Sequence, residues 1–292
     1  MNSITQPLVS IICLCYNHED YVIEALHSVL TQDYPNIQLI IVDDKSQDGS
    51  VQRVKKYLED KPQIIFIKNK KNIGNCRSFN KAFPFAEGKY VIDLAADDVL
   101  AQGMLKRQAF FFEQQKENVG VVFANAQYIT EQGVMMKLHH EVNKDGNSTP
   151  PLPQGDIYLD LVKNYFICPP TMMMKADVLE VLGGYDAMLA YEDFDFWIRS
   201  SRNCHYAYLD EVVIKKRVVK GSLSSKAYQR KMQKSTFEVC KKIYKLNKTK
   251  REHQALLWRL LYEAKPALKT AYLSLVLRYM ILFMKTTLKA FF

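Results

Sequence analysis

Strand-like and helix-like segments alternate along residues 8–126, and this alternation constrains the fold more than any other feature of the chain. Apolar runs rich in β-branched residues predict strands at residues 8–15, 37–42, 64–67, 90–94 and 119–126. Between them, helical spacing of apolar residues predicts helices at residues 19–31, 50–58, 76–86 and 103–116. Strands that alternate with helices in this way predict a parallel α/β sheet with helices on both faces.

Three acidic pairs stand at the boundaries of predicted elements. Asp43-Asp44 ends the run 37–42, Asp97-Asp98 follows the run 90–96, and Glu192-Asp193 opens an amphipathic stretch at 194–199. Ligands of parallel α/β sheets bind at the carboxyl ends of the strands. Adjacent carboxylates repel each other, so such a pair usually has a cation or a sugar hydroxyl to hold. The pairs therefore predict one metal-dependent site that handles a nucleotide.

Length and composition set the broad class. With 292 residues, of which 48% are hydrophobic, the chain can bury the core of one large domain or of one domain with an appendage. Residues 1–7 lack the basic start and the long apolar core of a secretory signal. The six cysteines form no CxxC pair, and Cys13 and Cys15 share one strand face and cannot easily bridge. We expect a reducing, cytoplasmic setting and no structural zinc.

Positive charge is concentrated at the C-terminal end. Residues 215–292 hold 20 Lys and Arg against 3 acids, a balance of +17, so the rest of a chain of net charge +9 carries −8. We expect helix throughout the residues beyond 226. A basic tail suits an anionic partner. Because its basic residues mingle with long aliphatic stretches, we expect an anionic membrane surface and no nucleic acid.

The last predicted helix, residues 266–292, carries polar residues on one narrow stripe made of Ser274, Arg278, Lys285 and Lys289. Charges interrupt its apolar stretches, so it lacks the ~18 uninterrupted apolar residues of a spanning helix. The stripe is typical of a helix that lies in a membrane interface. A helix packed against the core or a partner, with a solvated stripe, is the alternative interpretation.

Five motifs resemble, in order, those of the family 2 glycosyltransferases, which are inverting enzymes with the nucleotide-diphosphate-sugar-binding GT-A fold. The motifs are residues 9–17 (VSIICLCYN), residues 25–35 with 41–50, Asn72-Ile-Gly74 with Asn80, residues 86–98, and residues 192–199. The resemblance covers roughly residues 8–200. It implies a GT-A catalytic domain with a central, mostly parallel sheet at residues 1–224, followed by a basic helical C-terminal extension at residues 225–292.

The resemblance also implies roles for individual residues. Asp98 would bind Mg²⁺ or Mn²⁺, and Asp97 would contact the ribose or the water shell of the cation. Asp44 would accept a hydrogen bond from a uracil imide, with Asp43 supporting the turn. Asp193 would be the general base, and the adjacent Glu192 is an open alternative. The remaining nucleotide-binding residues would be Leu14, Cys15, Asn17 and Arg77.

The chain departs from the family pattern at four places. Leu14-Cys15 replaces Pro-Thr of the first motif, and Ala95 replaces the first acid of the usual D-x-D-D stretch. Phe79 stands where an arginine often precedes the equivalent of Asn80, which leaves Arg77 as the nearest substitute. Val219 stands where a histidine often supplies a further phosphate or metal contact.

We therefore expect an enzyme that transfers a sugar from a nucleotide-diphosphate donor, with UDP as the expected nucleotide. The acceptor would be a hydroxyl of a glycan, lipid-linked and growing at the inner face of the plasma membrane, as in bacterial-type polysaccharide assembly. Two alternatives stay open. A sugar nucleotidyltransferase would need a glycine-rich phosphate loop, and residues 13–17 contain no glycine. The second alternative is a non-catalytic scaffold that only binds a nucleotide sugar. Ala95 and Val219 keep it open, because each replaces a residue that the family pattern often has at the site.

Overall fold

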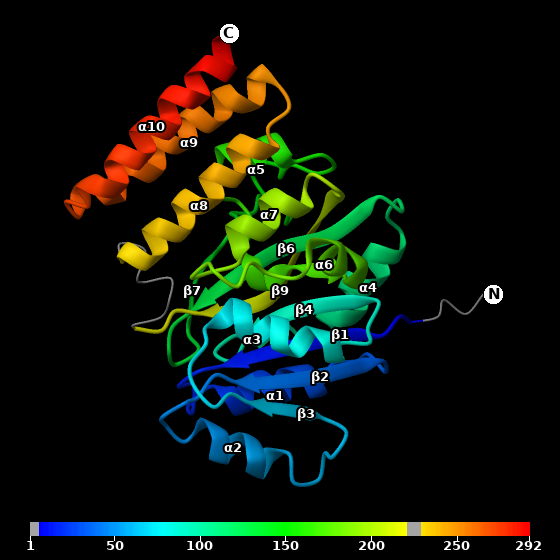
Figure 1. The fold of residues 1–292 in the computed structure, drawn as a ribbon. Coiled ribbons are helices and arrows are strands. Elements are labelled where there is room, and N and C mark those ends of the chain that lie inside the picture. Colours follow the sequence, from blue (N-terminus) through cyan, green and yellow to red (C-terminus); the bar gives the residue numbers. More distant parts are fainter. Residues whose placement is uncertain (1–5, 221–228) are drawn as a thin grey trace.

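The computed structural model describes residues 6–220 and 229–292, and one nine-stranded sheet forms the centre of this part of the molecule (Figure 1). The strand order is β3-β2-β1-β4-β8-β6-β9-β5, with β7 paired to β6. The strands are β1 (Val9–Cys15), β2 (Ile37–Asp43), β3 (Ile65–Lys68), β4 (Tyr90–Ala95), β5 (Val99–Leu100), β6 (Val119–Ile129), β7 (Met135–Leu138), β8 (Met173–Lys175) and β9 (His205–Arg217).

The helices cover both faces of this sheet. They are α1 (Val22–Leu30), α2 (Ser50–Tyr57), α3 (Asn75–Ala82), α4 (Met104–Glu113), α5 (Tyr158–Lys163), α6 (Ala176–Leu182), α7 (Asp193–Ser200), α8 (Arg230–Leu246), α9 (Lys250–Lys269) and α10 (Leu273–Phe291). Alternate residues of β1 face opposite sides: Ile11 belongs to the apolar cluster that includes α1 and α4, and Ile12 belongs to the cluster that includes α3 and α7. This arrangement confirms the predicted α/β fold.

The N-terminal half of the sheet is parallel, as expected. β1 pairs in parallel with both β2 and β4, and β2 pairs in parallel with β3. The carboxyl ends of β1, β2 and β4 therefore lie on one edge of the sheet, and Asp43 and Asp97 stand there. Beyond β4 the sheet is mixed, because β8 runs antiparallel to both β4 and β6.

The pairing of β5 with β9 places the second half of the chain at the same edge. β5 follows Asp98 directly, and Leu100 lies opposite Ile214 in an antiparallel register. The end of β9, with Lys216 and Arg217, therefore lies beside the turn that holds the second acidic pair. No local pattern in the sequence predicted a strand as short as β5.

The three C-terminal helices pack on the rest of the molecule through a shared core. Phe237 of α8, Leu256 of α9 and Leu282 of α10 join the apolar cluster that also holds Ile12 and Phe196. Lys242 of α8 forms ion pairs with Asp186 at 2.6 Å and with Asp195 at 2.5 Å. The predicted boundary at 224/225 lies outside the described residues, as does the predicted start at residues 1–5.

The predicted start of the last helix is wrong. Pro266 lies inside α9, which ends at Lys269, and the chain reverses at Ala271, whose φ is +50°, before α10 starts at Leu273. Proline is common in the first turn of a helix, whereas Pro266 stands near the end of α9. The true start of α9 is a capping box, in which the Thr249 side chain accepts a hydrogen bond from the Glu252 N–H.

Candidate active site

A cleft of about 600 Å³ opens at the carboxyl edge of the sheet. Six of its lining side chains are acids that come from distant segments: Asp44, Asp93, Asp97, Asp98, Glu192 and Asp193. Four basic residues line it as well: Lys216, Arg217, Lys220 and Lys231. The structure thus brings at least one member of each predicted acidic pair to one cavity. Asp43 of the first pair is buried and does not line the cleft.

The turn after β4 holds Asp97 and Asp98, which are 8% and 3% exposed. The Arg217 N–H donates to Asp98 Oδ1 at 2.8 Å, and the Arg217 Nε donates to the Asp97 carbonyl at 3.0 Å. His18 Nε2 lies 3.8 Å from Asp97 Oδ2. These contacts fix the backbone of the turn and leave Asp98 Oδ2 without a hydrogen bond from the described residues.

Burial first, and then the neighbouring Asp97 charge, raise the pKa of Asp98 to about 7, although Lys216 and Arg217 oppose the shift. A cation placed beside such a buried carboxyl stabilises its charged form. Among the described residues, no group of three or more His, Cys, Asp or Glu side chains could hold a metal ion by itself. Mg²⁺ is usually bound by one or two carboxylates, with water and substrate phosphates as the other ligands. The pair Asp97-Asp98 fits that kind of site.

A second acidic cluster, made of Asp93, Glu192 and Asp193, lines the same cleft. Burial raises the pKa of Asp193 to about 6 and that of Asp93 to about 7, and the Asp193 charge adds to the shift of Asp93. The pKa of Glu192 is raised well above its usual value, by burial first and then by Asp193 and Asp93. A hydrogen bond joins Glu192 to Asp193, and it raises the pKa of Glu192 and lowers that of Asp193. Within this pair, therefore, Glu192 keeps its proton to a higher pH than Asp193 does.

Lys216 lies between the two clusters. Its pKa is raised above the usual value by Cys168 first and then by Asp98 and Asp193, against the opposing effect of burial. Lys216 forms no direct ion pair of 4.0 Å or less within the described chain. One ammonium group thus interacts electrostatically with carboxylates on both sides of the cavity.

Asp44 lies on a third side of the cleft, where its carboxylate orders a loop. Its Oδ1 accepts from Asn69 Nδ2 at 2.9 Å and from the Ile73 N–H at 2.8 Å, and its Oδ2 accepts from the Gly74 N–H at 2.7 Å. Asp43 supports the adjoining turn through Ser46, whose N–H donates to Asp43 Oδ1 at 3.0 Å. Asp43 Oδ2 has no hydrogen-bond partner in the described part of the chain.

The end of β1 supplies two of its three predicted residues to the cleft. Leu14 and Asn17 line the cavity, and Cys15 is buried beside them without lining it. Asn17 adopts a positive φ of +57°, and its Oδ1 accepts from the Gln47 N–H at 2.8 Å. Asparagine is one of the few residues that tolerate this backbone region. Burial raises the pKa of the Cys15 thiol to about 12, so it stays protonated.

Arg77 does not line the cleft. It is exposed on α3, and its Nε donates to the Ala187 carbonyl at 3.0 Å. The position of Val219 does line the cleft. The chain thus offers an apolar side chain where the family pattern often has histidine, and the neighbouring Lys216 and Lys220 bring positive charge to the same strand end.

Sequence reasoning missed Asp93, Lys216 and the anchoring role of Arg217. Asp93 is a charged residue inside the apolar run of β4, and this was the available signal. It points to the same face of β4 as Ala95, because strand residues two apart share a face. Tyr185 packs beside it and a hydrogen bond from Tyr185 lowers the pKa of Asp93. No local signal marked Lys216 or Arg217, since the pairing of β9 with β5 and β6 places them.

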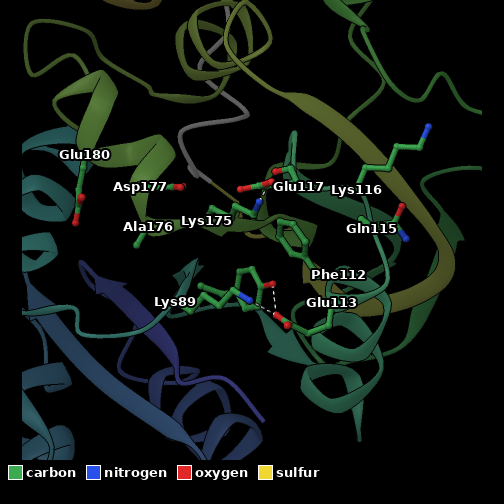
Figure 2. Close-up of a pocket in the computed structure, with 11 residues that line it drawn as sticks. Lys89, Phe112, Glu113, Gln115, Lys116, Glu117, Lys175, Ala176, Asp177 and Glu180 are labelled. Atoms are coloured by element: carbon green, nitrogen blue, oxygen red, sulfur yellow. Dashed lines mark hydrogen bonds and ion pairs between the residues drawn. The ribbon is translucent and has the colours of Figure 1, made fainter. Parts of the chain in front are cut away.

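A second hollow of about 500 Å³ lies at the amino end of β4, the opposite end from Asp97 (Figure 2). Its two lysines Lys89 and Lys175 pair with protein groups: Lys89 Nζ lies 2.6 Å from Glu113 Oε1, and Lys175 Nζ donates to the Glu117 carbonyl at 2.6 Å. Because members of all three predicted acidic pairs line the cleft at the carboxyl edge and none lines this hollow, that cleft is the candidate active site.

Comparison with known proteins agrees with this geometry. A profile of glycosyl transferase family 2 matches residues 10–183. An uncharacterized glycosyltransferase of Methanocaldococcus jannaschii is 29% identical over 220 residues, which cover 73% of this chain and 71% of that protein. A Bacillus subtilis protein provisionally named a teichuronic acid biosynthesis glycosyltransferase is 28% identical over 244 residues, which cover 83% of this chain and 90% of that protein.

Solved structures share the fold. S. aureus TarS 1–349, in complex with UDP-GlcNAc, matches with a TM-score of 0.68 at 20% identity, over 96% of this chain and 79% of that one. Mannosyltransferase PcManGT from Pyrobaculum calidifontis, in complex with GDP-Man and Mn²⁺, matches with a TM-score of 0.63 at 18% identity, over 97% of this chain and 85% of that one. With more than half of its length matched by the family profile, and with this fold, the chain belongs to glycosyl transferase family 2 and is a GT-A glycosyltransferase.

Proposed function

We propose that the protein is an inverting, metal-dependent glycosyltransferase that moves a sugar from a nucleoside-diphosphate donor, most simply a UDP-sugar, to a hydroxyl of an acceptor glycan. One observation carries the proposal. Asp193, a buried carboxyl with a pKa of about 6, lines the same cleft as the carboxylate pair Asp97-Asp98. Inversion by single displacement needs a base on one side of the sugar and a stabilised leaving group on the other.

Asp193 is the proposed general base. Its carboxylate takes the proton of the acceptor hydroxyl while the hydroxyl oxygen forms a bond to C1 of the sugar. The bond from C1 to the diphosphate oxygen breaks on the far side, and the electron pair leaves with the diphosphate. The raised pKa of Glu192 supports this assignment, because a protonated Glu192 donates a hydrogen bond to Asp193 and cannot itself accept the proton.

Asp98, assisted by Asp97, would hold Mg²⁺ or Mn²⁺, which neutralises charge that develops on the departing diphosphate. Lys216, between the two acidic clusters, would place its ammonium against the phosphates, a contact that the histidine of the family pattern often makes from the position of Val219. Lys220 and Lys231 at the cleft wall add positive charge. A diphosphate is a dianion or more, so this concentration of cations near Asp98 offsets the repulsion from the carboxylates.

The nucleotide and the acceptor follow from comparison as proposals. The structures of TarS with UDP-GlcNAc and of PcManGT with GDP-Man and Mn²⁺ support a nucleotide-sugar donor and a divalent cation. Asp44 would accept a hydrogen bond from the uracil through the remaining lone pair of Oδ2. Relatives named for teichuronic acid and minor teichoic acid biosynthesis support a cell-envelope glycan acceptor. We propose a lipid-linked acceptor that is extended on the cytoplasmic face of the membrane.

A thermal-shift screen of nucleotide sugars, with and without Mn²⁺, tests this function. We expect one group of nucleotide sugars to raise the melting temperature only when Mn²⁺ is present. Stabilisation by a nucleoside triphosphate together with a sugar phosphate, and by no nucleotide sugar, would instead indicate a sugar nucleotidyltransferase. Binding of a nucleotide sugar without release of nucleoside diphosphate in the presence of acceptor glycans would indicate a scaffold.

A further inference from the structure

Helix α10 has two apolar faces, and the protein covers one of them. The covered face, made of Leu275, Tyr279, Leu282, Thr286 and Ala290, packs on α8 and α9. A second set of large apolar residues lies on the other side of the helix and is between 56% and 72% exposed: Leu273, Leu277, Met280, Met284, Leu288 and Phe291. At about 100° per residue this set forms one continuous stripe along the helix. We call it the outer stripe.

A row of basic residues runs along one side of the outer stripe. Arg278, Lys285 and Lys289 recur at helical spacing, and α10 contains no acidic residue. Arg278 pairs with Glu238 of α8 at 2.9 Å, and Lys289 lies over the Tyr244 ring of α8 at 4.6 Å from its centre. These contacts set the orientation of α10, so the basic row lies toward α8 and the outer stripe faces away from the protein.

Helix α9 adds exposed apolar groups beside α10 (Figure 1). Trp258 is 75% exposed, Leu261 50% and Tyr262 58%, and they recur at helical spacing with Lys265. Soluble proteins seldom expose this many large apolar side chains on adjoining helices without a partner. Tryptophan and tyrosine are enriched at the level of lipid headgroups.

The start of α10 adjoins the mouth of the active-site cleft. Lys231 and Met232, in the first turn of α8, line the cleft. Their neighbours Arg230 and Lys234 lie over the ring of Tyr272, at 4.9 and 5.9 Å from its centre. Tyr272 is the residue before α10. The outer stripe therefore begins at the rim of the cavity that receives the acceptor.

We propose that the outer stripe of α10, with Trp258 and Tyr262 of α9, docks the protein on an anionic phospholipid bilayer. Helix α10 lies in the plane of the interface, its apolar side chains enter the acyl region and its basic row meets the headgroups. No helix of the described chain is long and apolar enough to cross a bilayer, so the contact is peripheral. The docking itself is independent of the chemistry; that it presents the cleft to a lipid-linked acceptor rests on the proposed function.

The charge pattern favours a bilayer over a second copy of the chain. Residues 215–292 carry 20 Lys and Arg against 3 acids. Two outer stripes packed on each other would bring the basic row of each copy close to that of the other, and the repulsion would oppose association. An anionic surface gains from the same charges, by roughly 1 kcal/mol for each basic residue near the headgroups, which is about fivefold in binding.

Sedimentation of the full chain with lipid vesicles, in low salt and without nucleotide, tests the proposal. We expect the protein to sediment with phosphatidylglycerol-containing vesicles and to remain in solution with pure phosphatidylcholine. The double variant Leu277→Asn with Met284→Asn keeps the charge and removes the centre of the stripe, and we expect its partition coefficient to fall by at least about tenfold. The matched control, Val134→Asn with Val181→Asn, replaces two apolar residues elsewhere that are 63% and 76% exposed, and it should bind like the wild type.

A second variant pair tests the charge. Lys285→Gln with Lys289→Gln should weaken binding by about tenfold or more, since each lysine near the surface contributes about fivefold. Lys55→Gln with Lys56→Gln removes the same charge from α2, at the far end of the molecule (Figure 1), and should have little effect. High salt should abolish the difference, because it screens charges beyond the Debye length.

Three results would overturn the proposal: wild-type protein that ignores anionic vesicles in low salt, stripe variants that bind as well as their controls, or a dimer in light scattering that Leu277→Asn with Met284→Asn converts to monomer. The last result would make the stripe a subunit interface. Calorimetry with UDP on each variant separates this from the chemistry. Intact UDP binding in a variant that leaves the vesicles shows a folded protein with an altered surface, whereas absent UDP binding in the wild type counts against the proposed function alone.

Discussion

The backbone N–H of Arg217 donates a hydrogen bond of 2.8 Å to Asp98 Oδ1, although the two residues are 119 positions apart in the sequence. The same residue donates through its guanidinium to the carbonyls of Asp97 and Glu131 and to the Glu24 carboxylate, at 3.0, 2.8 and 2.6 Å. Arg217 is 4% exposed, and its hydrogen-bond donors bind other groups of the protein. It acts on the candidate metal site by holding the turn that carries Asp97 and Asp98.

Replacement of Arg217 by methionine should destabilise the fold. The buried carbonyl of Asp97 and the partly buried carbonyl of Glu131 would lose their donors. The free energy of unfolding should fall by about 2–4 kcal/mol, since a buried acceptor left without a donor costs about 1–3 kcal/mol. Glu24→Gln is the matched control, because the Glu24 side chain is 55% exposed and an exposed ion pair contributes ~1 kcal/mol or less. Urea denaturation measures both. Equal losses in the two variants would show that the buried donors of Arg217 do not anchor the turn.

Asp193→Asn should abolish sugar transfer and leave donor binding nearly intact. The amide keeps the size of the carboxylate and cannot accept the acceptor proton, so turnover should fall by about 10²-fold or more. Glu192→Gln should retain most of the activity, because the Gln amide can still donate a hydrogen bond to Asp193. Steady-state kinetics and calorimetric donor binding check both variants. An active Asp193→Asn beside an inactive Glu192→Gln would move the base to Glu192.

The pH dependence of kcat/KM should report the ionisation of Asp193. The base works only when ionised, so activity should fall as the pH decreases through about 6, the pKa to which burial raises this carboxyl. The Lys216 charge lowers the pKa of Asp193, so in Lys216→Met that pKa rises and the acidic limb should move to higher pH. Lys216→Arg keeps the charge and should keep the limb in place. A limb that stays in place in Lys216→Met would contradict the interaction.

The sequence alone predicted the strands and acidic pairs whose signals lie within a few neighbouring residues. The apolar runs of β1, β2 and β4 and the acidic pairs that follow them predicted the carboxyl edge of the sheet, because a strand and its end are encoded within a few residues. The contacts of Arg217 and the cluster of Asp93 with Asp193 could not be predicted, because strand pairing between distant segments creates them. Asp44 shows a third case: its position was predicted, and the Ile73 and Gly74 N–H groups that occupy its carboxylate became visible only in the folded loop.

The most direct test of the account is calorimetric titration of UDP in the presence and absence of Mn²⁺. The central claim is that the cleft binds a nucleoside diphosphate through a divalent cation held at Asp98. We predict that chelation of the metal weakens UDP binding, and that Asp98→Ala weakens it by at least about tenfold, or about 1.4 kcal/mol, with Mn²⁺ present. Asp60→Asn, which changes an acid with an 80% exposed side chain outside the cleft, should bind UDP like the wild type. UDP affinity that is the same with chelator, and the same in Asp98→Ala, would contradict the claim.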